Sequence, residues 1–303
     1  MHRELTSFFH IEAYSAFLFL AFLCGHMWAR RRARTTAVEP RHIDNLTLLI
    51  ILFSLVGARL FSWMFYQKPG TPFFENLKLW GGGGLVFYGG MLFGLGCVVV
   101  YSLLIRISFG KLADIYAPSL ALGLGFGRIG CFMAGCCWGD ICSPAALAGL
   151  DPVVIHQVTT VPALSPAGFP LAVTFPPDTG AFQQHSRLGL ITENASRSLP
   201  VHPAQLYEAV LAFLLCFYLH RSFRRGHFRG EIFARFGIGY ALIRFLVEFL
   251  RADNPPQYVG LTLSQVISLI VGLGAAAYYF VQKRMSADLA MREVAVLPDA
   301  VDV

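Results

Sequence analysis

Apolar stretches of about 18 to 25 residues recur along this 303-residue chain, and they constrain its fold more than any other feature. An α-helix rises 1.5 Å per residue, so about 20 apolar residues cross the roughly 30 Å hydrocarbon core of a bilayer. Only 14% of the residues are charged, whereas a soluble domain carries about 25%. The sequence therefore predicts an all-α, polytopic membrane protein with about seven transmembrane helices. The predicted spans are 13–29, 45–66, 84–105, 112–134, 203–220, 231–250 and 262–281.

The basic residues between these spans predict the orientation of the chain. Fourteen Lys and Arg fall in the loops and the tail on one side of the membrane. Six fall on the other side, which includes the longest loop. Cytoplasmic loops carry the excess of positive charge, so we expect the N-terminus outside and the C-terminus in the cytoplasm. The basic residues form short runs without interleaved aromatic residues, so the net charge of +6 does not indicate nucleic-acid binding.

The domain organisation that we expect is simple. Residues 1–285 form a single transmembrane domain, and residues 286–303 form a cytoplasmic tail. The long loop, 138–202, is rich in Pro, Thr and Gly and has strand-like stretches at 171–175 and 188–192. It is interpreted as a small extracytoplasmic element and not as a second domain.

Arg244 and Glu248 lie four residues apart in the sixth span, and Tyr240 precedes Arg244 by four. Residues at this spacing share one face of a helix. An arginine at membrane depth costs at least about 2.5–3.5 kcal/mol, so the stripe must face the interior of the bundle. It indicates a functional site, or else an ion pair that only holds helices together.

A glycine-rich segment surrounds a second intramembrane arginine, Arg128. Its glycines allow close approach of the backbone, and with the guanidinium they would form a clamp for a phosphate group. Close helix packing is the alternative. The glycines are Gly125, Gly127, Gly130, Gly135 and Gly139.

Two further side chains are candidates at membrane interfaces. Tyr88 lies in a glycine-flanked entry to the third span, where an anchoring role is the alternative. His202 precedes Pro203 at the start of the fifth span, where it would act as a base near neutral pH or would only order the loop. Glu208, in the same segment, would orient a partner.

Four cysteines cluster at Cys131, Cys136, Cys137 and Cys142. They lack the paired CxxC spacing of a zinc site, so we expect no metal ion, and nothing in the sequence calls for a cofactor. A disulfide between Cys136 and Cys137 would strain the peptide that joins them. Free thiols, or a bond from one of these two to Cys142, are expected instead.

Taken together, these segments resemble the prolipoprotein diacylglyceryl transferase family of bacterial inner membranes, in a Gly-Cys-Cys variant. The similarity runs in order from about Tyr14 to Asn254. It rests on Gly84–Gly90, Gly127–Gly139, His202–Glu208 and Arg244–Arg251.

The resemblance implies that the chain transfers the diacylglyceryl group of phosphatidylglycerol to the lipobox cysteine thiol of a prolipoprotein signal peptide, releasing glycerol phosphate. Its partners would be these two substrates and membrane lipids. It also implies that Arg128 and Arg244 bind the phosphate, with Glu248 fixing Arg244. Tyr14 aligns with a tyrosine near the family's lipid site, and Gly130, Gly139 and Tyr240 join the predicted lipid-binding set.

Three positions depart from the family pattern. Cys131 replaces the usual Asn, Cys136 replaces a Glu, and Tyr88 stands at the usual His, which is proposed to activate the thiol. Tyrosine is a poor base at pH 7, with a reference pKa near 10. Either His202 is the base, or the positive field of Arg128 and Arg244 activates the thiol, and we expect the second.

These departures leave two other functions open. One is a family relative that binds or moves anionic phospholipid without the chemistry, and the other is a transferase with a different thiol acceptor. A channel or secondary transporter would show two matching halves, and the sequence has no such repeat.

Overall fold

The computed structural model describes residues 13–66, 86–142, 170–225, 228–252 and 260–296. The chain forms two compact units, one made of residues 26–116 and the other of residues 1–25 together with 117–303. Within the described ranges the regular secondary structure is helical, with three isolated β-bridges besides. The helices α1 and α5 contribute residues to both units.

Each predicted span falls on a helix. These helices are α1 (Ala13–Ala33), α2 (Pro40–Tyr66), α4 (Phe87–Leu104), α5 (Phe109–Ala134), α8 (Ala204–Phe223), α9 (Glu231–Glu248) and α10 (Leu263–Val296). Among the described residues, four segments are long and apolar enough to cross a membrane: Pro40–Phe65, Phe109–Ala134, Ala204–Phe223 and Leu263–Asp288. The prediction of a helical membrane protein is confirmed, while the number of seven spans and the sidedness of the termini stay predictions.

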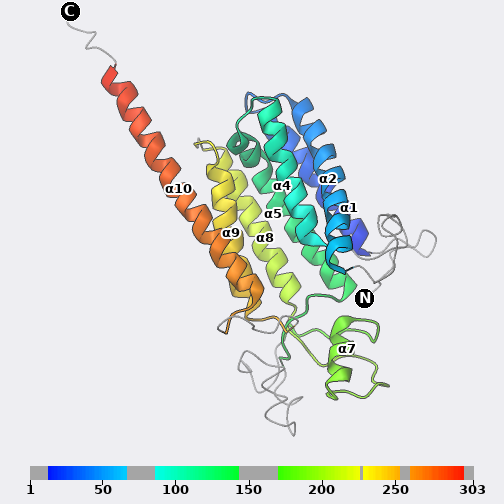
Figure 1. Cartoon of the computed structure of the whole chain (residues 1–303). Coiled ribbons are helices and arrows are strands. Elements are labelled where there is room, and N and C mark those ends of the chain that lie inside the picture. Colours follow the sequence, from blue (N-terminus) through cyan, green and yellow to red (C-terminus); the bar gives the residue numbers. More distant parts are fainter. Residues whose placement is uncertain (1–12, 67–85, 143–169, 226–227, 253–259, 297–303) are drawn as a thin grey trace, which may run out of the picture. The chain divides into compact units, whose positions relative to one another are not determined.

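In the unit of residues 26–116, α2 and α4 pack closely through glycines (Figure 1). A Cβ atom added at Gly57 would lie 2.5 Å from the Gly89 carbonyl oxygen, and one added at Gly89 would lie 2.3 Å from the Gly57 carbonyl oxygen. Small residues let helix backbones approach in this way inside membranes. Gly89, beside the candidate Tyr88, therefore has a packing role.

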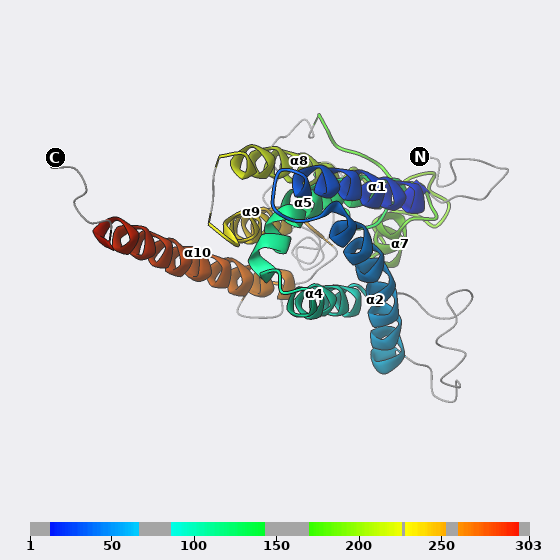
Figure 2. The same ribbon diagram turned by 90° about the horizontal axis from the view of Figure 1, so that it is seen from above.

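In the other unit, α9 lies between α8 and α10, as both views show (Figures 1 and 2). Gly237 of α9 faces Ala275 of α10, and Gly272 of α10 faces Ala241 of α9. This close packing brings the polar stripe of α9 next to residues at the start of α10.

The described part of the predicted extramembrane element includes the short helix α7 (Gly180–Arg187), which lies beyond the first turn of α8 (Figure 1). Its buried core consists of Ile141, Phe175, Ala181 and Val201, with Phe132, Trp138, Val173, Leu190 and Leu199 packed around it.

Of the two strand-like stretches, 171–175 contributes only one bridge, from Val173 to Val201. The strand expected at 188–192 is wrong. Gly189 has a φ of +70°, and two hydrogen bonds, Leu190 N–H to the His185 carbonyl and Gly189 N–H to the Ser186 carbonyl, terminate α7 there. This Schellman arrangement excludes extended backbone at Gly189.

Candidate functional site

The predicted ion pair of α9 forms the first half of a buried charged cluster. Arg244 Nη1 lies 2.6 Å from Glu248 Oε2, and the Glu248 side chain is fully buried. Thr262, just before α10, and Ser264, in its first turn, add hydrogen bonds to this pair. Thr262 donates to Glu248 Oε1 at 2.7 Å, and Arg244 Nη2 donates to Ser264 Oγ at 3.0 Å.

Glu208 of α8 joins this pair to Arg128 of α5. Its Oε2 atom lies 3.0 Å from Arg128 Nε and 3.9 Å from Arg244 Nη1. Its Oε1 atom accepts a 3.0 Å hydrogen bond from the Tyr240 hydroxyl. Arg128, which was predicted separately from the stripe of Tyr240 and Arg244, therefore meets both on one carboxylate that is only 1% exposed.

A third arginine, Arg251, extends the cluster at the end of α9. Its Nε atom lies 3.6 Å from Glu248 Oε2, and the residue is buried. Sequence reasoning counted Arg251 among loop charges and missed it, although its position three residues after Glu248 is a helical pairing distance.

We call Arg128, Arg244, Arg251, Glu208 and Glu248 the arginine centre. It holds three guanidinium groups and two carboxylates in a largely buried place. A buried charge needs a partner of opposite sign. Guanidinium groups suit phosphate oxygens, because they present several donors in one plane. The centre can therefore bind a phosphate-like anion.

Gly139 positions Arg251. The Gly139 N–H donates to the His202 carbonyl at 3.0 Å, and the Asp140 N–H donates to the Leu250 carbonyl at 2.8 Å. A Cβ atom at residue 139 would lie 2.5 Å and 2.7 Å from these two carbonyl oxygens, so only glycine allows the approach. The structure thus gives Gly139 a backbone role, and its predicted role in binding the lipid stays a prediction.

Gly130 of α5 packs against the first turn of α1. A Cβ atom there would lie 3.1 Å from Tyr14 Cδ2 and 3.5 Å from Phe17 Cβ. Tyr14 itself is 39% exposed. The two predicted lipid-binding residues Tyr14 and Gly130 are therefore neighbours, and they belong to the same unit as the arginine centre.

The two candidate bases differ in their surroundings. His202 is buried, and its Nδ1 atom lies 3.4 Å from the Tyr207 hydroxyl. Burial lowers the pKa of His202 below its ordinary value. Tyr88 is exposed near the start of α4 and belongs to the unit of residues 26–116, so its role in the chemistry stays a prediction.

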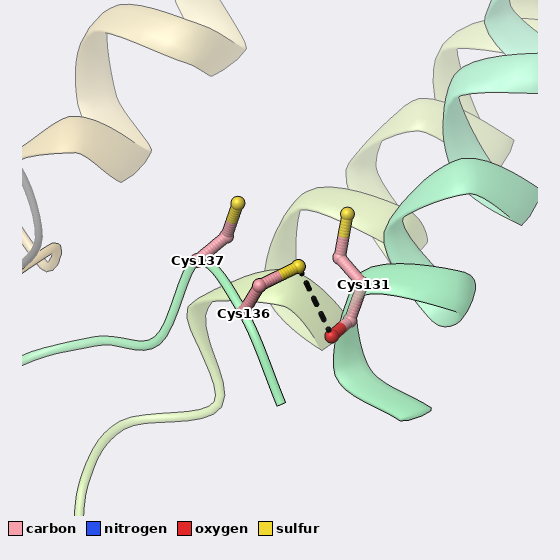
Figure 3. A group of neighbouring side chains, drawn as sticks. All are labelled: Cys131, Cys136 and Cys137. Atoms are coloured by element: carbon pink, nitrogen blue, oxygen red, sulfur yellow. Dashed lines mark hydrogen bonds between the residues drawn. The ribbon is translucent and has the colours of Figure 1, made fainter. Parts of the chain in front are cut away.

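The cysteines of the glycine-rich segment converge (Figure 3). Cys131 is on α5, Cys136 and Cys137 follow its end, and their three Sγ atoms lie within 4.8 Å of one another. All seven cysteines are free thiols, so the predicted alternative of a disulfide to Cys142 is not formed. We call Cys131, Cys136 and Cys137 the thiol cluster. Its convergence was not predicted from the spacing.

The thiol cluster also has unusual electrostatics and backbone geometry. Interactions with the neighbouring Cys131 and Cys136 thiols lower the pKa of Cys137, and the positive charges of Arg251 and Arg128 lower it further. Cys137 adopts a φ of +61°, a left-handed conformation that costs a non-glycine residue roughly 1–2 kcal/mol. Gln205 Nε2 holds the loop by donating to the Cys136 carbonyl at 2.7 Å.

Fold and site together define a helical membrane protein with a buried cationic centre. The chain belongs to the prolipoprotein diacylglyceryl transferase family, whose model matches residues 3–281.

Similar proteins named phosphatidylglycerol–prolipoprotein diacylglyceryl transferase occur in several bacteria. The protein from Clostridium tetani is 29% identical over 266 residues, covering 87% of this chain and 91% of its own length. That from Cronobacter sakazakii is 29% identical over 287 residues, covering 88% of each chain. That from Nitratidesulfovibrio vulgaris is 30% identical over 275 residues, covering 86% of each.

Proposed function

We propose that this chain is a phosphatidylglycerol–prolipoprotein diacylglyceryl transferase of a bacterial inner membrane, crossing it seven times. It transfers the diacylglyceryl group of phosphatidylglycerol to the lipobox cysteine thiol of a prolipoprotein and releases glycerol phosphate. The observation that carries this proposal is the arginine centre, in which three guanidinium groups gather around two buried carboxylates in a chain of this family.

The chemistry explains why the arginines matter. The sulfur of the acceptor attacks a glyceryl carbon, a carbon–sulfur bond forms, and the carbon–oxygen bond to the phosphate breaks. Negative charge then builds on the departing glycerol phosphate. Fixed guanidinium groups stabilise that charge more in a site shielded from water than in solution. Arg128 and Arg244 supply this stabilisation in the proposal.

The two carboxylates act on the arginines and not on the lipid. Glu208 holds Arg128 and Arg244 toward a common point, and Glu248 holds Arg244 and Arg251. The Tyr240 hydroxyl occupies one oxygen of Glu208. Each carboxylate thus contacts groups of the protein, and the arginines, which carry five N–H donors each, bind the substrate phosphate in the proposal.

The remaining predicted residues surround this centre in the proposal. Tyr14 and Gly130 form an edge of the lipid site, and Gly139 fixes the backbone beside Arg251. His202 is buried and remains neutral at pH 7, so it can accept a proton, whereas Tyr88 is the weaker base.

The test is transfer of a labelled diacylglyceryl group from phosphatidylglycerol to a lipobox peptide by the purified protein. Arg244→Ala is compared with Arg235→Ala. Arg235 is a matched control, because it is also on α9 and also pairs with a glutamate four residues away, Glu231, but its side chain is 28% exposed.

We expect a thioether product with the wild type and with Arg235→Ala, and a loss of about 100-fold or more with Arg244→Ala. A wild type that binds phosphatidylglycerol but forms no product contradicts the transferase proposal. That outcome favours the lipid-binding alternative, or another thiol acceptor if a different thiol is modified.

A further inference from the structure

We propose that the thiol cluster binds a zinc ion through Cys131, Cys136 and Cys137, leaving a fourth coordination position open to the acceptor thiol. The inference rests on the proposed function for the identity of that acceptor. The metal-binding part stands on the geometry of the cluster alone.

The first argument is distance. Zinc–thiolate bonds are about 2.3 Å long, so tetrahedral geometry separates two sulfur ligands by about 3.8 Å. The three Sγ atoms already lie within 4.8 Å of one another. Each sulfur pair is therefore within about 1 Å of the spacing that zinc requires.

The second argument is the backbone that creates the convergence. Successive residues of an extended chain point in opposite directions. The left-handed φ of +61° at Cys137 breaks this alternation, and its sulfur joins those of Cys136 and Cys131 (Figure 3). Sparsely populated backbone conformations of this kind concentrate at functional sites. The hydrogen bond from Gln205 to the Cys136 carbonyl anchors the same loop.

The third argument is the choice of ligand atom and the local charge. Thiolates are soft ligands that select zinc over magnesium or calcium. Three thiolates and one Zn²⁺ carry a formal charge of one negative. Arg251 pairs through its backbone with Gly139, two residues after Cys137, so its positive charge lies near the ligands and offsets that charge. The loaded site would lie beside the arginines proposed to receive the phosphate.

The ligand number determines what such an ion could do. Structural zinc sites are closed by four protein ligands, whereas sites with three protein ligands keep a position for substrate. In the part of the chain that the structure describes, the group of potential ligands is these three cysteines. A thiol that coordinates zinc loses its proton outright.

The step balances in atoms and charge. The acceptor thiol releases its proton to solvent as its sulfur binds zinc. This sulfur then forms a bond to the glyceryl carbon, and the electron pair of the breaking carbon–oxygen bond leaves with glycerol phosphate. The thioether product is neutral and a weaker ligand than thiolate. No strongly basic side chain is then needed to deprotonate the acceptor thiol. This agrees with the presence of tyrosine, and not histidine, at residue 88.

The binding experiment uses the full chain, purified in detergent, reduced and freed of metal. Zn²⁺ is added and bound zinc is measured by elemental analysis, and Co²⁺ is added in parallel to record sulfur-to-metal charge-transfer absorption. Each of Cys131→Ser, Cys136→Ser and Cys137→Ser is compared with Cys97→Ser. Cys97 is a matched control, because it is a partly buried thiol in the other unit.

We expect one zinc ion per chain in the wild type and in Cys97→Ser, with affinity reduced about tenfold or more in each of the other three variants. A wild type without bound zinc under reducing conditions overturns the inference. Equal zinc binding in all four variants also overturns it.

The open position is tested on the Co²⁺-loaded protein. A lipobox peptide with its cysteine should change the absorption spectrum, whereas the same peptide with serine should not. Identical spectra with both peptides would contradict an open coordination position for the acceptor thiol.

Transfer assays then separate this inference from the proposed function. Full transfer by zinc-free protein overturns the role of zinc and leaves the transferase intact. A zinc-loaded protein that takes the cysteine peptide as a ligand but never forms a thioether supports the site and contradicts the transferase.

Discussion

Each unit of the protein holds a cluster of charged side chains at a helix bundle, and the two clusters differ in burial and in the number of guanidinium groups. In the unit of residues 26–116, Asp44 Oδ1 lies 3.1 Å from Arg30 Nε and 3.3 Å from His26 Nε2, and all three side chains are 28–46% exposed. In the arginine centre, both carboxylates are at most 1% exposed, and three guanidinium groups share them.

The difference shows which arginine cluster is built for a ligand. Arg30 has a carboxylate of its own and access to solvent, so its pair is screened and contributes little. The arginine centre holds three guanidinium groups largely away from water, where their attraction to a phosphate is stronger than at the surface. The four predictions below test this contrast, from the largest expected effect to the smallest.

Replacing Arg128 should have the largest effect. Arg128→Ala removes a guanidinium that lies 3.0 Å from Glu208 and lowers the positive charge at the proposed phosphate. We expect transfer to fall by about 10²–10³-fold, the usual effect of removing one group that stabilises a developing anion. Arg30→Ala should stay within about twofold, since its pair is exposed. Equal losses of the steady-state transfer rate in Arg128→Ala and Arg30→Ala would contradict a special role for the arginine centre.

Neutralising one carboxylate in each cluster should affect stability unequally. Glu248→Gln leaves Arg244 and Arg251 without the charge that both contact, so we expect it to lower the free energy of unfolding by about 3 kcal/mol. Asp44→Asn should cost less than about 1 kcal/mol. Thermal unfolding in detergent measures both changes. A larger loss of stability for Asp44→Asn than for Glu248→Gln would contradict the conclusion that the buried carboxylate contributes more to stability.

Acid should act on the extramembrane element and not on the guanidinium groups, which remain charged at every pH in question. Burial lowers the pKa of His185 from 6.5 to about 4. Its Nδ1 atom accepts the Leu199 N–H at 3.2 Å, which requires the neutral ring. Between pH 6.5 and 4 the unfolded chain therefore binds a proton that the folded chain does not.

Consequently, the free energy of unfolding should decrease as pH falls through this window, by up to about 3 kcal/mol. Intrinsic fluorescence should report the transition, because Trp138 donates to Gln184 of α7 at 2.9 Å. His185→Gln should flatten the pH dependence between 6.5 and 4. An unchanged slope in that variant would assign the acid sensitivity to another group.

The smallest effect that we predict concerns the backbone beside Arg251. Gly139→Ala places a methyl group against two carbonyl oxygens and should destabilise the protein by about 1–3 kcal/mol. Gly274→Ala is the matched control, because a Cβ atom there has no neighbour within 4 Å and alanine favours a helix. Comparison of the two melting temperatures tests whether close approach at Gly139 holds the centre together. Equal values would exclude that role.

The fold could be predicted where hydropathy alone decides it. Long apolar runs must be helical in a membrane, so all seven predicted segments are helices in the structure. The strand expected at 188–192 failed because Gly189 is left-handed and Leu190 packs against the buried core that includes Ala181 of α7. That conformation depends on tertiary contacts that a local pattern does not record.

The candidate site could be predicted in part for a similar reason. Tyr240, Arg244 and Glu248 share one helix, so their spacing revealed the stripe. Arg128 and Glu208 come from different helices, and only the fold shows that they pair. The convergence of Cys136 and Cys137 depends on one backbone angle, which spacing does not specify.

The central claim is that the arginine centre binds the phosphate of an anionic lipid. Native mass spectrometry of the purified protein with phosphatidylglycerol, against phosphatidylcholine as the zwitterionic competitor, tests it most directly in wild type, Arg244→Ala and Arg235→Ala. We predict preferential phosphatidylglycerol binding by the wild type and by Arg235→Ala, and loss of that preference in Arg244→Ala. The same preference in all three proteins would contradict the claim.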